Sequence, residues 1–104
     1  MKRNIELIRL ILLNQEEVSE NNPGISEKYS DDLRKFSNEE RVYNTYLLIN
    51  GKFLDGECMY QFGQVASCCI NNITWKGQEL LTVLRNKASF EALKKGLNNG
   101  MTIV

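Results

Sequence analysis

Three cysteines are the residues of this chain best suited to nucleophilic, redox or metal chemistry, and the sequence contains no histidine. Without histidine no Cys-His or Ser-His pair can form, and the usual general base is missing. Cys58, Cys68 and Cys69 are an odd number with one adjacent pair, which is not typical of a disulfide framework and indicates a reducing compartment. A zinc site would need two paired cysteine or histidine clusters, so we expect no metal site and interpret the cysteines as small apolar strand residues.

The acidic residues offer no catalytic arrangement either. They stand at positions typical of helix caps and solvent-facing surfaces, and no spacing among them indicates a carboxylate pair. The chain also has no glycine-rich phosphate-binding loop. We therefore expect a binding protein with no enzymatic activity and no cofactor.

Polar residues in and just before segment 38–50 could contact DNA bases, because asparagine and arginine are good readers of the major groove. The residues predicted to share this polar face are Ser37, Asn38, Arg41, Asn44 and Thr45. Lys2, Arg3 and Lys76 could then hold phosphates of double-stranded DNA and fix the register. The alternative interpretation is a solvated helix face with no partner.

Apolar spacing predicts the helices that would position these residues. A first helix is predicted from Lys2 to Val18, and seven of the nine residues in segment 5–13 are apolar. This stripe is wider than one core face needs, which predicts burial on two sides, either inside the domain or against a second copy in a homodimer. A short second helix is predicted within residues 25–36. Ser37 and Glu40 form a capping box that starts a third helix over 38–50, which Gly51 would end in a left-handed conformation.

The apolar period changes from 3.6 to 2 after the third helix. Cys58, Tyr60 and Phe62 alternate with polar neighbours, and a turn predicted at Gly63–Gln64 leads into a second strand, which together make a β-hairpin. A helix follows Thr74, and Gly77 in its first turn indicates close packing. A last helix is predicted to carry Phe90, Leu93 and Leu97.

Three helices followed by a hairpin predict the α+β class and a winged helix, with the hairpin as its wing and additional C-terminal helices. In this architecture the third helix enters the DNA major groove. We expect the winged-helix domain to span residues 1–85, and residues 86–104 to form a C-terminal helical extension and tail.

Three parts of the sequence carry a resemblance to a known family. They are the segment MKRNIELIR at residues 1–9, the segment ITWKGQELL at residues 73–81, and Tyr43 with Leu47 and Leu48. They are similar to the signatures of a family of short proteins common in phages and prophages, catalogued as a domain of unknown function. The resemblance covers residues 1–85 and implies a winged-helix fold and a mobile-element origin. Asn44 stands where that family usually has histidine, and Lys52 where it usually has glycine, so a role that depends on that histidine is not carried over.

Charge argues against DNA. The chain has 13 basic and 13 acidic residues, whereas phosphate neutralisation dominates DNA affinity. Residues 53–75 contain no lysine or arginine, but they do contain Asp55 and Glu57. DNA-associated transcriptional regulation therefore competes with a second hypothesis, a protein-binding module that inhibits or modulates a host complex, for example as an anti-defence inhibitor, through Met59, Tyr60 and Gln61.

Two further expectations concern location. Lys2 and Arg3 precede an apolar run, but no small-residue cleavage site follows it, so we do not expect a signal peptide. Nothing approaches the roughly 20 apolar residues that cross a bilayer. We expect the protein to have no membrane partner and to be located in the cytoplasm of a bacterial host.

Overall fold

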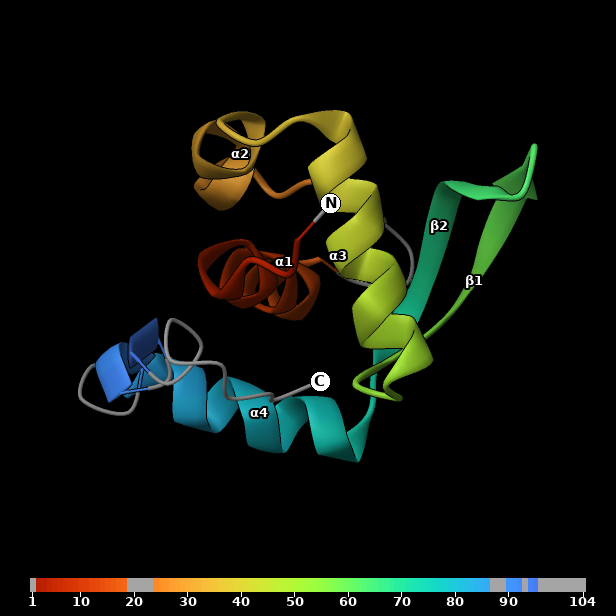
Figure 1. Ribbon diagram of the computed structural model, residues 1–104. Helices are drawn as coiled ribbons and strands as arrows, with labels where there is room; N and C mark the ends of the chain where they lie inside the picture. The colour runs from red at the N-terminus through yellow and green to blue at the C-terminus, as the bar shows by residue number, and fades with distance from the viewer. Residues whose placement is uncertain (1, 19–23, 87–89, 93, 96–104) are drawn as a thin grey trace.

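The computed structural model describes residues 2–18, 24–86, 90–92 and 94–95. This part of the chain is an α+β structure. It consists of a group of helices with a two-stranded antiparallel hairpin beside them (Figure 1). The elements in chain order are α1 (Ile5–Glu17), α2 (Glu27–Arg34), α3 (Asn38–Asn50), β1 (Leu54–Gln61), β2 (Gln64–Ile73) and α4 (Trp75–Arg85). Among the residues so described, no helix is long and apolar enough to cross a membrane.

Helix α1 is the centre of the molecule. It begins at Ile5, later than predicted, because the Asn4 side chain accepts hydrogen bonds from the backbone N–H groups of Glu6 and Leu7 and caps the helix. The helix packs against α2, α3, α4 and β2. Its wide apolar stripe is therefore covered from several sides within one domain, as one of the two alternatives predicted. The other alternative, a homodimer through this stripe, loses its basis because these side chains are already buried in a single copy.

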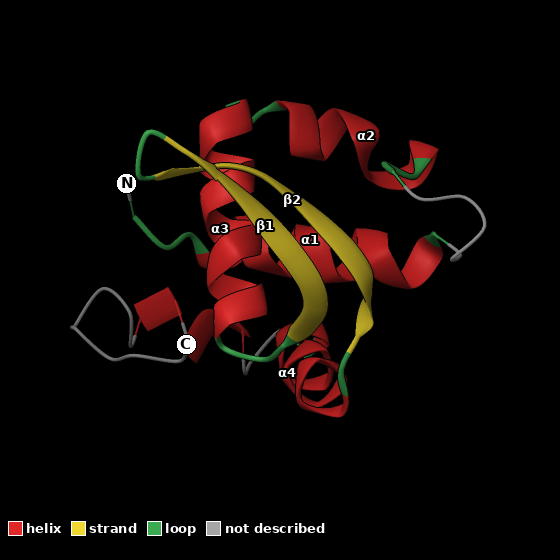
Figure 2. Ribbon diagram, turned by 90° about the vertical axis from the view of Figure 1, so that its right-hand side faces the viewer, coloured by secondary structure: helices red, strands yellow, loops and turns green. Residues whose placement is uncertain are grey.

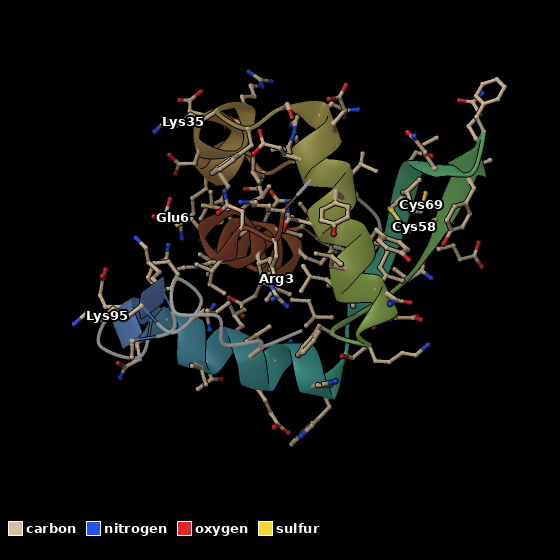
Figure 3. The ribbon with its side chains drawn as sticks, in the orientation of Figure 1. Arg3, Glu6, Lys35, Cys58, Cys69 and Lys95 are labelled. Carbon is tan, nitrogen blue, oxygen red and sulfur yellow. A yellow bond between two sulfur atoms is a disulfide. The ribbon has the colours of Figure 1, made fainter. Side chains whose placement is uncertain are left out.

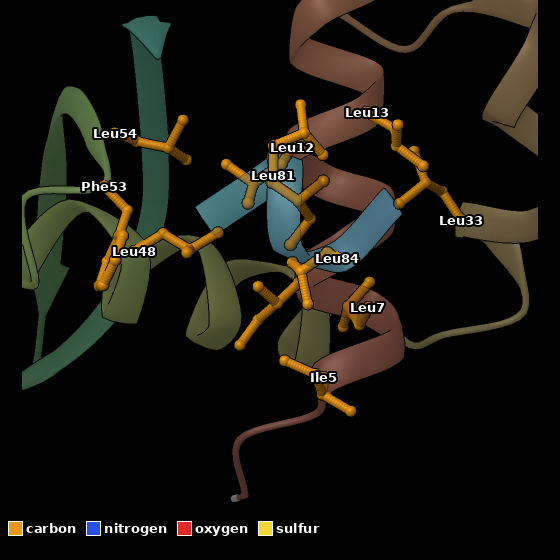
Figure 4. Close-up of a cluster of buried hydrophobic side chains, with 12 residues drawn as sticks. Ile5, Leu7, Leu12, Leu13, Leu33, Leu48, Phe53, Leu54, Leu81 and Leu84 are labelled. Atoms are coloured by element: carbon orange, nitrogen blue, oxygen red, sulfur yellow. The ribbon is translucent and has the colours of Figure 1, made fainter. Parts of the chain in front are cut away.

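The core forms where α1 meets the other helices (Figure 4). Half of its buried apolar side chains come from α1, and α2 contributes Leu33, α3 contributes Leu48, and α4 contributes Leu81 and Leu84. Each fully buried side chain of this size contributes about 1.5–3 kcal/mol relative to an exposed one. The complete buried set is Ile5, Leu7, Ile8, Ile11, Leu12, Leu13, Leu33, Leu48, Phe53, Leu54, Leu81 and Leu84.

The predicted second and third helices are confirmed, and the third has the predicted bounds. The Ser37 hydroxyl accepts a hydrogen bond from the N–H of Glu40, and the Glu40 carboxylate accepts one from the N–H of Ser37, so the capping box is formed. The predicted end of α3 is wrong in detail. Gly51 has a φ of −82°, and the residue with left-handed φ is Lys52, at 68°.

The hairpin is twisted and carries two irregularities in its register (Figure 2). Asp55 pairs with Asn72 while Gly56 pairs with Ile70, and a second shift follows Met59, so β2 contains extra residues at both places. Such bulges increase the twist of a strand pair. The predicted turn at Gly63–Gln64 is wrong by one residue, because Gln61 pairs with Gln64 and the turn consists of Phe62 and Gly63.

Helix α4 begins at the base of the hairpin, where the Thr74 hydroxyl accepts a hydrogen bond from the N–H of Gly77. The predicted close packing at Gly77 is confirmed, because a Cβ atom there would collide with the carbonyl oxygen of Phe53. Phe90 packs on the core from beyond α4, and its ring lies 5.4 Å from the guanidinium carbon of Arg9. Leu93 and Leu97 of the predicted last helix, and the tail at residues 101–104, lie outside the described residues.

Candidate binding surface

The predicted base-reading face of α3 divides into an exposed end and a buried middle. Ser37 and Asn38 are exposed at the start of the helix. Asn44 is fully buried and Thr45 is 9% exposed, so the prediction that both face solvent is wrong. These two side chains cannot reach a base edge in this conformation.

The burial of Asn44 has a structural cause. Its Oδ1 accepts a hydrogen bond from the backbone N–H of Asn4 at 2.9 Å, and its Nδ2 donates to the carbonyl of Glu40 at 2.9 Å. The Thr45 hydroxyl donates to the carbonyl of Arg41 at 2.8 Å, within the helix. Both residues satisfy backbone groups of their own fold, which is the usual state of a buried polar side chain.

Of the predicted phosphate-binding cations, Lys76 lies at the end of α3 opposite to Ser37 and Asn38. Lys76 Nζ donates a hydrogen bond to the carbonyl of Gly51 at 2.9 Å and lies 4.4 Å from the ring centre of Phe53, so it holds the end of α3. Ser37 caps the opposite end, and a helix of 13 residues is roughly 20 Å long. Lys2 and Arg3 lie in the segment before α1 (Figure 3 labels Arg3).

The hairpin residues named by the protein-binding hypothesis lie together near its turn. Met59 is 70% exposed, Tyr60 is 62% exposed, and Gln61 is also exposed. The hairpin turn lies at the end of the strands that projects away from the helices (Figure 1). Met59 and Gln61 therefore lie on an open part of the described surface, whereas Tyr60 contacts Tyr46 of α3 through its ring.

The alternation pattern missed the most exposed of these residues. Phe62 was predicted on a strand, but it lies in the turn with 98% of its surface exposed. Phe62 and Gly63 both have positive φ, at 54° and 78°, as the two central residues of a type I′ turn do. Asparagine, aspartate and glycine are preferred there, and a bulky residue with positive φ is an outlier. In the sequence, only Gly63 indicated a turn at this position, because phenylalanine is not a typical residue of such turns.

A groove of about 630 Å³ runs between α3 and the hairpin. Its walls include Tyr43 and Tyr46 of α3 and Tyr60 of β1. The rings of Tyr46 and Tyr60 meet edge to face with centroids 6.4 Å apart, and those of Tyr43 and Tyr46 are 6.5 Å apart. Glu39 contributes the groove's charge, and no lysine or arginine is among its lining residues. This is an aromatic surface of neutral to negative character.

The cysteines differ from their predicted state. Cys58 and Cys68 stand opposite each other in the hairpin and form a disulfide, while Cys69 is free and exposed (Figure 3). The odd number of cysteines gave no indication of this pair, because the sequence alone does not show that Cys58 and Cys68 are paired across the two strands. The prediction that the cysteines are unpaired is therefore wrong for Cys58 and Cys68, and the cysteines no longer support a reducing compartment. Within the described ranges, no three side chains of the metal-ligating types gather at one place.

Comparison with known proteins identifies the chain only through a family model. The model described as "Hypothetical protein (DUF2513)" matches residues 2–103. No curated protein and no solved structure matches the chain.

Proposed function

Since the chain belongs to the family described as Hypothetical protein (DUF2513), whose description states no activity, we propose from its surface that it is a non-catalytic protein-binding module. In this proposal the frame is a winged helix, and the partner protein is bound by the hairpin turn together with the groove beside α3. The resemblance to short phage and prophage proteins favours a host protein as the partner, whose activity the bound hairpin would inhibit or modulate.

The observation that carries the proposal is the conformation of Phe62. An aromatic residue in a left-handed conformation costs of order 1–3 kcal/mol, and such strain is typical of functional positions. Nothing in the fold offsets this cost, because the side chain is 98% exposed. A phenylalanine at this place is best explained by a contact with another molecule that has an apolar pocket.

The surroundings of Phe62 fit a protein better than a nucleic acid. Exposed Met59 and Tyr60 add apolar side chains beside the turn, one on each face of β1. Aromatic residues are enriched at the energetic centres of protein interfaces. Residues 53–75 carry Asp55 and Glu57 but no basic residue. A hairpin of this charge would repel phosphates.

A DNA duplex is the second candidate. The order of helices and hairpin favours it, since a winged helix presents its third helix to the major groove. The burial of Asn44 and Thr45 leaves Ser37, Asn38 and Arg41 as the remaining predicted readers. If DNA is the partner, binding to a fluorescent random-sequence duplex at low salt must weaken steeply as salt rises from about 50 to 200 mM.

The test of the protein-binding proposal is comparative capture from a cell extract. Wild-type protein, the Phe62→Asn variant and a Trp75→Gln control are immobilised separately. The control also loses one aromatic ring, which is 82% exposed at the start of α4, away from the turn. We expect a protein retained by the wild type and the control to be lost from Phe62→Asn. Equal retention by all three would refute the assignment of the turn as the binding surface.

A further inference from the structure

A second cavity, of about 450 Å³, lies between α1, α3, β2 and the chain leading into α2. Its walls are largely apolar and include Ile11, Leu33, Val42 and Ile70. The volume falls within the range of about 300–1,000 Å³ that is typical of small-molecule sites. It is lined by several elements at once, so its shape is fixed by the fold.

Arg41 brings a positive charge into this apolar cavity. Among the lining residues, all of which the structure describes, it is the one that carries a charge. Its Nε is shielded from solvent and has no hydrogen-bond partner among the described protein groups. The Arg41 side chain makes no ion pair among the described residues. A ligand carboxylate that reaches its terminal Nη groups would therefore not compete with an acidic side chain of the protein.

Two of the other polar side chains of the cavity, Asn14 and Thr45, are hydrogen-bonded within the fold. Asn14 donates to the carbonyl of Gly24 at 2.9 Å and accepts from the N–H of Ser26 at 2.7 Å. Thr45 donates to the carbonyl of Arg41. These bonds hold the walls of the cavity together. The Arg41 guanidinium is the charged donor of the lining, and the amides of Gln15 and Asn38 are neutral donors and acceptors in the same lining.

We propose that this cavity binds a small molecule made of a carboxylate and a short apolar body. The carboxylate accepts hydrogen bonds from the guanidinium of Arg41, with which it is geometrically matched, and the apolar body lies against Ile11, Val42 and Ile70. The sequence indicated Arg41 as a DNA contact, whereas its partly buried position assigns it to this ligand. The site uses none of the hairpin-turn residues Met59, Tyr60 and Phe62, so it stands independently of the proposed function.

The test uses sodium octanoate as the probe, with 1-octanol and sodium acetate as comparisons that lack the charge and the apolar body. Binding is followed by NMR chemical shifts of labelled protein, including the Nε–H signal of Arg41 and the methyl signals of Ile11 and Ile70. Arg41→Met removes the charge, and Arg34→Met is the matched control, since Arg34 is exposed at the end of α2.

We expect octanoate to shift these signals and to bind at least about tenfold more tightly than octanol or acetate, an effect of the size that one charged pair gives. Arg41→Met should abolish the preference for octanoate over octanol, and Arg34→Met should keep it. Octanol binding as tightly as octanoate, or no shift at the cavity residues with any probe, would overturn the proposal. The wild-type comparison decides this even if Arg41→Met does not fold.

Discussion

The backbone N–H of Asn4 donates a 2.9 Å hydrogen bond to Oδ1 of Asn44, which joins the start of α1 to the middle of α3. Asn4 also caps α1 with its side chain, and Asn44 also donates to the carbonyl of Glu40. One buried amide therefore fixes how the central helix begins relative to the helix across from it. Asn44 is a structural residue of this fold.

Replacing Asn44 with alanine should lower the free energy of unfolding by about 2–3 kcal/mol, because the N–H of Asn4 loses its acceptor in a partly buried place. Urea unfolding measures this change. Asn44→His is the informative companion, since a neutral imidazole can accept with one nitrogen and donate with the other. It should retain more stability than alanine. Equal losses in the two variants would contradict the bridging role.

Lys52→Gly should raise the free energy of unfolding by about 0.5–1 kcal/mol. Lys52 has a φ of 68°, a conformation that glycine adopts without the steric cost of a Cβ atom. Its side chain is exposed and makes no ion pair among the described residues, so little is lost with it. Lys52→Ala is the control and should give no such gain, since alanine keeps the Cβ.

Phe62→Asn should stabilise the isolated protein by about 0.5–1 kcal/mol, because Asn-Gly is a preferred pair for a type I′ turn and Phe62 has no packing to lose. Thermal or urea unfolding of the purified variant tests this. A lower unfolding free energy would mean that Phe62 stabilises the fold. The strained turn would then need no binding partner to explain it.

Alkylation of the folded, unreduced protein should modify Cys69 and leave Cys58 and Cys68 unmodified, as peptide mass spectrometry would show. The loop closed by the disulfide spans a sequence separation of 10, so chain entropy predicts a stabilisation of about 2–3 kcal/mol. A Cys58→Ser/Cys68→Ser double variant should lose about that amount. Modification of all three thiols in the unreduced protein would contradict the pairing.

The local parts of the fold could be predicted and the contacts between elements could not. Ser37 and Glu40 set the start of α3 because a capping box acts over four neighbouring residues. The burial of Asn44 depends on where α1 crosses α3, which helical spacing does not state. An amide that looks solvent-facing by its polarity is in fact bonded to backbone from two elements.

The hairpin shows the same division. Alternating residues indicated its two strands, but the two register shifts and the turn are set by pairing between strands. A turn displaced by one residue moves Phe62 from a predicted strand face to the exposed tip, and the same pairing brings Cys58 opposite Cys68. The candidate binding surface was therefore predicted in part, at Met59, Tyr60 and Gln61, while its most exposed member was missed.

The central claim is that the hairpin turn contacts a partner protein, and photocrosslinking from the turn tests it most directly. Phe62 is replaced by p-benzoylphenylalanine, which keeps an aromatic ring at the tip, and the same replacement at exposed Lys35 of the α2 end serves as the control. After irradiation in cell extract, we predict a discrete protein adduct from position 62 that is absent from position 35. No adduct from position 62, or an adduct only with nucleic acid, would contradict the account.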